Sequence, residues 1–340
     1  MSFRGRLTWV AGLVIAAAVC GASLRHAVYS RPAARGGGSL PVLFLVETGE
    51  AFSSVASRLR ALGLVEHPRG VEVYAWLRGW DRRVKAGTYQ LVRGERARDI
   101  LAKLVSGDVL RVSVTIPEGF THAQIAGALA AEADVDSTVF AGLLTKREIL
   151  DDLGVKGPSL EGYLFPDTYL IPWGTTPEGI AGMMRARLEE ILAAGMDKRS
   201  EQIGMTRHQV LTLASIIQAE GRLPEELALV SAVYHNRLRA GMKLEADPTV
   251  AYAMGGYKGR LYYKDLEVDS PYNTYLHVGL PPGPICAPGK AAIIAALYPD
   301  TTCNALYFVA KGDGGHIFSL TLRDHVAAVQ AVKRARMASD

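Results

Sequence analysis

The stretch that decides the fold runs from Met205 to Gly255 and reads MTRHQVLTLASIIQAEGRLPEELALVSAVYHNRLRAGMKLEADPTVAYAMG. Its first part places apolar residues at the spacing of one helical face: Val210, Leu213 and Ile217. Glu220 continues this stripe into the last turn, and Gly221 is a typical stop signal. A carboxylate in this position is misplaced for stability, which makes Glu220 the first candidate for a functional role.

The position of Glu220 predicts an unusual pKa. Partial burial disfavours the charged carboxylate, and the negative end of the helix dipole disfavours it as well. Both effects favour a proton held near neutral pH, as a general acid for cleaving a glycosidic bond requires. The alternative is a helix-end glutamate that points to water or pairs with Arg222 or Arg237.

Two further helices are predicted in the same stretch. The second starts at Pro224. Its inner face consists of Leu227, Val230, Val233, Tyr234 and Leu238. The third starts at Asp247, an N-cap residue followed by Pro248, and stops at Gly255. We therefore expect three consecutive helices that converge on Glu220.

The composition is that of a globular protein with room for roughly two or three domains. The chain has 340 residues, of which 49% are hydrophobic and 21% charged. Its net charge of +4 comes without a concentrated basic block, so nucleic acid is not expected as a partner. The 3 cysteines show no metal-binding spacing, and we expect no metal and no cofactor. A disulfide between Cys286 and Cys303 is an open alternative in an oxidising compartment.

The N-terminal segment, residues 7–24, is uncharged and apolar. It predicts a single transmembrane helix, although its alanine and glycine content makes the pattern marginal for the ~20 residues needed. The alternative is a cleaved signal peptide with Arg4 and Arg6 in its charged region. Residues 31–39 are rich in glycine and predict a linker.

A strand, a glycine turn and an amphipathic helix recur after the linker. The repeated positions are Gly49–Val55–Leu59, Gly94–Ile100–Leu104 and Gly119–Ile125–Leu129. The first two copies, with an extra helix over residues 71–77, predict a small module over residues 40–110. The third copy opens a larger domain over residues 111–340. The expected fold class is thus α+β, with an N-terminal membrane helix, a small strand-helix module and a larger α+β domain.

The larger domain is predicted to continue with helices and to end in a hairpin. The expected helices cover residues 122–133, 137–144, 147–153 and 289–297, with a final helix from Asp324. LYFVA and HIFSL alternate across the glycine-rich KGDGG, which is typical of a β-hairpin. The run GLPPGPICAPG must be irregular, because its prolines lack backbone donors.

Residues near the proline-rich run are candidates for binding a sugar. Aromatic rings stack on pyranose faces, and amides bind hydroxyl and N-acetyl groups. These properties favour Tyr272, Asn273, Thr274 and Tyr275. Asn273 suits an Asx turn within its own loop equally well. His316, which opens the second strand of the hairpin, is a further candidate, with a structural role as its alternative.

A second carboxylate near Glu220 is the other open question. Ordinary glycosidases flank the bond with two carboxylates, ~5–5.5 Å apart in retaining enzymes and ~6.5–9.5 Å apart in inverting ones. Glu161 and Asp167, in the run LEGYLFPDTYLIP, are the best candidates. Asp167 follows Pro166 and equally suits a turn.

Four runs of the sequence carry a family likeness: LASIIQAEG, YHNRLRAGMKLEADPTVAYAMG, SPYNTYLHVGLPPGPICAPG and LYFVAKGDGGHIFSLTLRDH. They resemble successive blocks of the YceG-like endolytic murein transglycosylases, and the likeness covers roughly residues 40–335. The resemblance implies that Glu220 is the catalytic residue and that Asp247 and Thr249 bind substrate. The family commonly has a second glutamate where this chain has Gln218, so no role is carried over to that position.

The resemblance also implies a function and a place of action. It implies a membrane-anchored enzyme that cleaves peptidoglycan glycan strands with 1,6-anhydro ends, beside a peptidoglycan polymerase and outside the cytoplasm. The module over residues 40–110 resembles a LysM-like glycan-binding domain, with a mere spacer as its alternative. Two other functions stay open, namely a lysozyme-like hydrolase that uses Glu220 with Asp167 or Glu161, and a non-catalytic wall-binding scaffold.

Overall fold

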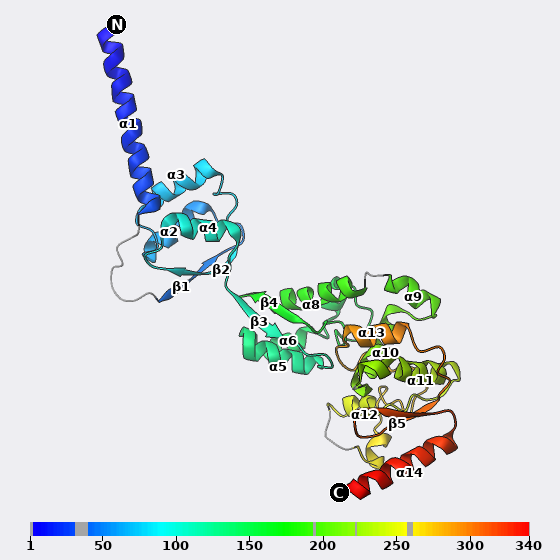
Figure 1. Cartoon of the computed structure of the whole chain (residues 1–340). Coiled ribbons are helices and arrows are strands. Elements are labelled where there is room, and N and C mark those ends of the chain that lie inside the picture. The colour runs from blue at the N-terminus through cyan, green and yellow to red at the C-terminus, as the bar shows by residue number, and fades with distance from the viewer. Residues whose placement is uncertain (1–2, 31–39, 193–194, 222, 257–260, 340) are drawn as a thin grey trace. The chain divides into compact units, whose positions relative to one another are not determined.

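Two compact units make up the chain in this computed structural model, which describes residues 3–30, 40–192, 195–221, 223–256 and 261–339. The first unit is Met1–Val112 with Leu170–Thr175, and the second is Ser113–Tyr169 with Thr176–Asp340. The structure is α+β and mostly helical, with small two-stranded sheets, which confirms the predicted class (Figure 1). The predicted linker over residues 31–39 lies outside the described residues.

The first unit contains the first two strand-turn-helix copies. Its elements are α1 (Phe3–Tyr29), β1 (Pro41–Val46), α2 (Phe52–Ala61), α3 (Pro68–Arg78), β2 (Gly87–Val92) and α4 (Ala97–Ser106). β1 and β2 pair antiparallel, with Pro41 opposite Val92. The turn residues Gly49 and Gly94 have φ of 78° and 89°, a conformation that favours glycine. The buried core of the unit includes Phe44, Leu59, Tyr89, Ile100 and Leu104.

The predicted N-terminal helix is present as α1. Its C-terminal end packs on the rest of the first unit, where Val28 is fully buried. Within the part of the chain that the structure describes, no helix is both long enough and apolar enough to cross a membrane. The predicted membrane anchor is therefore not shown.

A small sheet marks the division between the units. β3 (Arg111–Thr115) pairs with β4 (Thr168–Pro172), and each strand has residues in both units. Between these strands lie the three predicted helices, α5 (His122–Ala133), α6 (Ser137–Leu143) and α7 (Arg147–Asp152). A capping box of Thr121 and Gln124 starts α5. The chain then continues into α8 (Pro177–Leu192) and α9 (Met196–Gln202).

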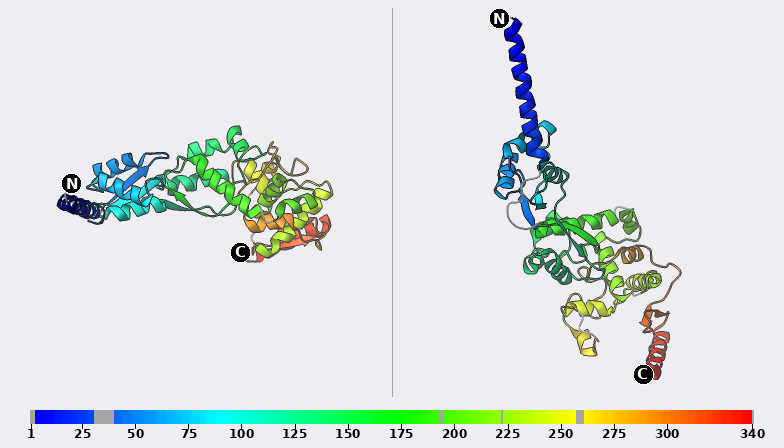
Figure 2. Two further views of the ribbon diagram at one scale, coloured as in Figure 1. Left: turned by 90° about the horizontal axis from the view of Figure 1, so that it is seen from above. Right: turned by 60° about the vertical axis from the view of Figure 1, so that its left-hand side comes forward.

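Helix α10 (Arg207–Glu220) lies at the centre of the second unit. Around it pack α11 (Leu227–Arg239), α12 (Asp247–Ala253) and α13 (Lys290–Leu297), as the views of Figure 2 show in green, yellow and orange. Every residue from Val210 to Ile217 is buried. Gly221 ends α10 with φ of −80°, and a Cβ there would lie 2.2 Å from Cδ2 of Leu227. Glycine therefore permits the close approach of α10 and α11, and the three predicted helices are confirmed.

Several predicted helix starts differ from the structure: α3 begins before residue 71, and the short helix η1 (Pro224–Glu226) precedes α11 where one helix was predicted from Pro224. Asp247 is the first helical residue of α12, and its N-cap is Ala246. Helix α14 (Leu322–Ser339) begins before Asp324, because the Thr321 hydroxyl caps its first turn by accepting a hydrogen bond from the backbone nitrogen of Asp324, at 3.2 Å. The remaining elements are the 3₁₀ helices η1 (Pro224–Glu226) and η2 (Tyr263–Glu267) and the predicted hairpin of β5 (Tyr307–Ala310) and β6 (His316–Ser319).

Candidate active site

Glu220 is the last residue of α10 and lies at the edge of the buried core. Ile217, one turn earlier, is fully buried, whereas Glu220 is partly exposed. Tyr234 of α11 donates a hydrogen bond from Oη to Oε1 of Glu220, at 3.2 Å. Burial raises the pKa of Glu220 to about 7, the charge of Asp247 adds to the rise, and the Tyr234 hydrogen bond opposes it. Glu220 thus combines a carboxyl group that holds a proton near neutral pH with a residue surface that is partly exposed.

Asp247 and Tyr275 form a pair next to this acid. Tyr275 donates a hydrogen bond from Oη to Oδ1 of Asp247, at 2.6 Å. Burial raises the pKa of Tyr275, and the hydrogen bond to Asp247 adds to the rise. Asp247 is also the charged neighbour that acts on Glu220. It is therefore a carboxylate that the structure brings to Glu220, and it was not among the second carboxylates expected there, Glu161 and Asp167.

Glu161 is a fully buried carboxylate, with 1% of its surface exposed. It accepts a hydrogen bond from the backbone nitrogen of His122 at 2.9 Å and one from Tyr252 Oη at 3.3 Å. The His122 ring also contacts it, with Nδ1 2.5 Å from Oε2, and this hydrogen bond raises the pKa of His122. Asp167 instead pairs with Arg187, whose Nε lies 2.8 Å from Oδ2. Both carboxylates are thus bound to partners of their own.

Three residues predicted to bind sugar are buried within the protein. Asn273 is fully buried, and its amide donates to two backbone carbonyls of its own loop and accepts from the backbone nitrogen of Tyr275. The hydroxyl groups of Thr249 and Thr274 lie 2.8 Å apart and are also buried. In this structure these three side chains offer almost no surface to a sugar, so their predicted role in binding stays a prediction. These side chains instead fix the loop that carries Tyr275 against the start of α12.

Tyr272 and His316 lie in other surroundings. The ring of Tyr272 is partly exposed and packs against Tyr252, with 5.0 Å between ring centroids. Since Tyr252 hydrogen-bonds to Glu161, Tyr272 belongs to the neighbourhood of that carboxylate. His316 is buried and pairs with Glu226, whose Oε2 lies 2.7 Å from Nδ1. The structure thus gives His316 a partner within the protein.

The alternative in which Arg237 neutralises Glu220 is not what the structure shows. The Arg237 guanidinium donates to the backbone carbonyls of Leu244 and Leu306, at 2.9 and 2.7 Å, and to the Glu245 carboxylate at 2.9 Å. Arg222 lies outside the described residues. Among those described, the hydrogen-bond partner of Glu220 is a neutral hydroxyl rather than a cation.

The cysteines are free thiols, so the Cys286–Cys303 disulfide does not form in this structure. Cys286 is buried and donates from Sγ to the backbone carbonyl of Ser215, at 3.3 Å. Burial raises the pKa of its thiol, which disfavours the thiolate that a cysteine nucleophile needs.

Two residues that contact the buried or partly buried carboxylates, Tyr234 and His122, were not predicted from the sequence to have a functional role. Tyr234 was placed on the inner face of its helix, but not as a partner of the acid. A signal was available, because a tyrosine hydroxyl on a buried face needs a hydrogen-bond partner. His122 gave no comparable signal, since its partner Glu161 lies in a distant part of the sequence.

At the end of a buried helix, Glu220 is a partly exposed acid whose pKa burial raises to about 7, and it accepts a hydrogen bond from a tyrosine. This arrangement suits a general acid–base centre. Comparison with known proteins places the chain more narrowly. It belongs to the YceG-like family, whose profile matches residues 44–331. This confirms the predicted family.

Three relatives show how far this likeness extends. The chain is 35% identical over 298 residues to the endolytic murein transglycosylase of Bacillus subtilis (strain 168), covering 82% of this chain and 81% of that protein. It is 31% identical over 304 residues to the endolytic murein transglycosylase of Streptococcus pneumoniae serotype 2, covering 80% of this chain but 55% of that protein. The crystal structure of a YceG-like protein from Listeria monocytogenes matches with a TM-score of 0.60 and 31% identity, over 86% of this chain and 100% of that chain.

Proposed function

We propose that this chain is an endolytic murein transglycosylase, which cleaves the bond between N-acetylmuramic acid and N-acetylglucosamine in glycan strands. The observation that carries the proposal is Glu220, a partly exposed carboxyl group whose pKa burial raises to about 7. A group with this pKa can give a proton and take one back near neutral pH. The names of the relatives from Bacillus subtilis and Streptococcus pneumoniae support the assignment.

Glu220 acts first as an acid and then as a base. It donates its proton to the glycosidic oxygen, and the bond from that oxygen to C1 of the muramyl residue breaks. The resulting carboxylate takes the proton from the C6 hydroxyl of the same residue, while O6 forms a bond to C1. The product is a 1,6-anhydro ring, no water is added, and Glu220 ends protonated as it began. Tyr234 stabilises the carboxylate between the two steps through its hydrogen bond.

The substitution Glu220→Gln tests the proposal. We expect the full chain to release 1,6-anhydro-muropeptides from purified sacculi. The variant should keep its fold, and its release of these products should fall on the order of 100-fold or more. Mass spectrometry of the products and circular dichroism of the protein give the two readouts. Glu225→Gln is the matched control, because Glu225 is an exposed carboxylate of the neighbouring η1 and should keep full activity. Substantial anhydro release by Glu220→Gln would contradict the proposal.

A lysozyme-like hydrolase is the second candidate, and the place of Asp247 beside Glu220 favours it. In such an enzyme Asp247 would serve as the second carboxylate, either as the nucleophile or as the base for a water. Hydrolysis adds a water to each cleaved bond and anhydro formation does not, so product mass separates the two reactions. Asp247→Asn should abolish hydrolysis, whereas a transglycosylase should keep its anhydro products and change its pH profile.

The first unit is proposed to bind glycan strands as a LysM-like module. Its antiparallel pair β1–β2 encloses two helices, α2 and α3, in one compact unit, which supports the module expected from the sequence. Binding to sacculi should survive Glu220→Gln, because the acid lies in the other unit. A purely scaffolding protein would bind in the same way, but its unsubstituted chain would release no product.

The place of action follows from the substrate. Since glycan strands lie outside the cytoplasm, we propose that the chain acts on the extracytoplasmic side of the cytoplasmic membrane, where it ends nascent strands beside a peptidoglycan polymerase. A phosphatase that folds only outside the cytoplasm, fused after residue 340, should be active. An inactive fusion, with a cytoplasmic reporter active at the same position, would contradict this location.

A further inference from the structure

Helix α3 exposes an apolar stripe with a tryptophan at its centre. Val73, Trp76 and Leu77 are 48%, 68% and 60% exposed. Their spacing places them on one face of the helix, together with Arg69 one turn earlier. The opposite face is buried in the first unit through Val71, Tyr74 and Ala75. Single exposed apolar residues are ordinary, but neighbouring ones on one helical face mark an interaction surface.

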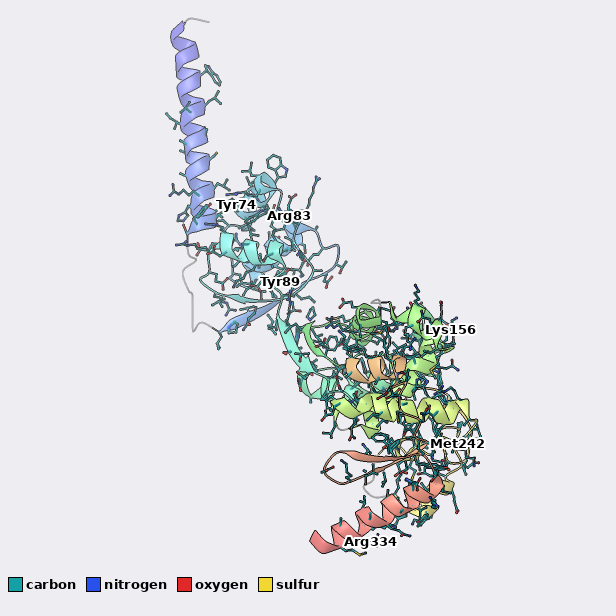
Figure 3. All side chains as sticks on the ribbon, turned by 45° about the vertical axis from the view of Figure 1, so that its right-hand side comes forward. Tyr74, Arg83, Tyr89, Lys156, Met242 and Arg334 are labelled. Atoms are coloured by element: carbon teal, nitrogen blue, oxygen red, sulfur yellow. The ribbon has the colours of Figure 1, made fainter. Side chains whose placement is uncertain are left out.

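The exposed charges in the segment that begins with the stripe, residues 69–85, have one sign. All exposed charged residues between positions 69 and 85 are cationic: Arg69, Arg78, Arg82, Arg83 and Lys85. The acids of the same segment, Glu72 and Asp81, are only partly exposed. Figure 3 labels Tyr74 within α3 and Arg83 in the turn that follows it. Arg82 and Arg83 follow α3 in the sequence, five and six residues after Leu77. We call Val73, Trp76 and Leu77 with Arg69, Arg82 and Arg83 the α3 surface.

Helix α1 joins the first unit directly beside α3. Its residue Ala27 packs so closely on Gly70 that a Cβ on this glycine would lie 2.7 Å from the Ala27 Cβ. Next to this contact the rings of Tyr29 and Tyr74 lie 6.3 Å apart. Further along α1 the apolar side chains are exposed: Trp9, Leu13, Val14, Ile15 and Val19. The first unit thus carries two exposed apolar surfaces on adjoining helices (Figure 1).

We infer that the α3 surface docks on the surface of an anionic lipid bilayer. An interfacial helix presents aliphatic side chains and tryptophan to the headgroup boundary, while arginines bind the lipid phosphates. The α3 surface has both features in one place, which a glycan strand would not require, because sugars offer neither an acyl boundary nor a dense negative charge. The apolar side chains of the adjoining α1 extend the same chemistry. This inference does not depend on the proposed reaction.

Hydroxyl-radical footprinting of the full chain tests the inference without labels. The chain is mixed with vesicles of phosphatidylcholine alone or with phosphatidylglycerol added, and oxidation of each side chain is read by mass spectrometry. We expect oxidation of Trp76 and Leu77 to fall severalfold with the anionic vesicles. Leu43 and Leu45 of β1 are the matched controls, since they are 55% and 48% exposed in the same unit, and their oxidation should not change.

Charge removal gives the second arm of the test. Arg82→Gln with Arg83→Gln should restore the oxidation of Trp76 on anionic vesicles to the level seen with phosphatidylcholine alone, because each exposed arginine strengthens binding to an anionic surface. Equal oxidation of Trp76 with both kinds of vesicle would overturn the inference. Protection of Trp76 by added glycan strands, and not by vesicles, would overturn it as well and assign the α3 surface to sugar.

Discussion

Glu220 and Glu161 belong to the same unit, but Glu220 is partly exposed, Glu161 is fully buried, and their surroundings differ. Glu161 is bound by the backbone nitrogen and the ring of His122, so its negative charge has a partner. Glu220 is bound by the neutral hydroxyl of Tyr234, and its charged neighbour is the like-charged Asp247. The comparison teaches that burial alone does not make a carboxylate the candidate acid. Burial without a compensating cation makes Glu220 the better candidate, because it keeps the proton in place.

The same substitution at both positions gives the largest expected contrast. Glu161→Gln removes the charge that pairs with His122, and we expect it to lower the free energy of unfolding by about 3 kcal/mol at pH 6. Glu220→Gln breaks no such pair and should not lower it. Urea unfolding followed by far-UV circular dichroism is the measurement, because all 4 tryptophans lie in the first unit and do not report on this one. An equal loss of unfolding free energy in the Glu161→Gln and Glu220→Gln variants would contradict the difference drawn here between the two carboxylates.

The pH dependence of stability sharpens the comparison between Glu220 and Glu161 further. The folded-state pKa of Glu220, about 7, lies above its ordinary value of 4.5, so the neutral form is favoured in the fold. Stability from this group is fully present below pH 4.5 and is lost as pH rises through 7. Glu220→Gln cannot ionise and should escape the loss. Its advantage over the unsubstituted chain should grow from near zero at about pH 4 to at most about 3 kcal/mol at about pH 8.

Unfolding curves at several pH values check this expectation. The Glu225→Gln variant, with an exposed carboxylate nearby, serves as the control and should show no such trend. A difference between Glu220→Gln and the unsubstituted chain that stays constant with pH would mean that Glu220 ionises normally in the fold.

Substitutions of the two neighbours of Glu220, Tyr234 and Asp247, should move the pKa of Glu220 in opposite directions. Tyr234→Phe removes the hydrogen bond that lowers this pKa, so the alkaline limb of the rate profile should move to higher pH. Asp247→Asn removes the negative charge that raises it, so the same limb should move to lower pH. We expect shifts of about half a pH unit to one unit, read from anhydro-product rates. Shifts in the same direction would show that these residues act on something other than Glu220.

The smallest effect on stability and rate is expected at the ion pair of Asp167, a carboxylate that is more exposed than Glu161. Arg187→Gln breaks its ion pair, in which both side chains are about two-fifths exposed, at 41% and 38%. Because solvent screens such a pair, stability should change by less than about 1 kcal/mol and the reaction rate should not change. A clear loss of rate would return Asp167 to the list of catalytic candidates.

Local patterns in the sequence settled most of the secondary structure. The stripe of Val210, Leu213 and Ile217 predicted α10 and its buried face, because helical periodicity is a property of neighbouring residues alone. Gly49 and Gly94 predicted turns for the same reason, since only a few residue types accept a positive φ. The place of Glu220 at the end of that stripe was likewise visible in the sequence.

Only the tertiary structure decided which groups surround the acid. Tyr234 and Asp247 reach Glu220 from two other helices, and Glu161 finds His122 across 39 positions of the chain. Such partners depend on how helices pack and how loops close, which no local pattern encodes. The sequence therefore determined that a carboxyl group ends a buried helix. The position of Glu220 also predicted a raised pKa, but the packing of α11 and α12 determined which groups set that pKa, because desolvation and the charge of Asp247 act only once the chain is folded.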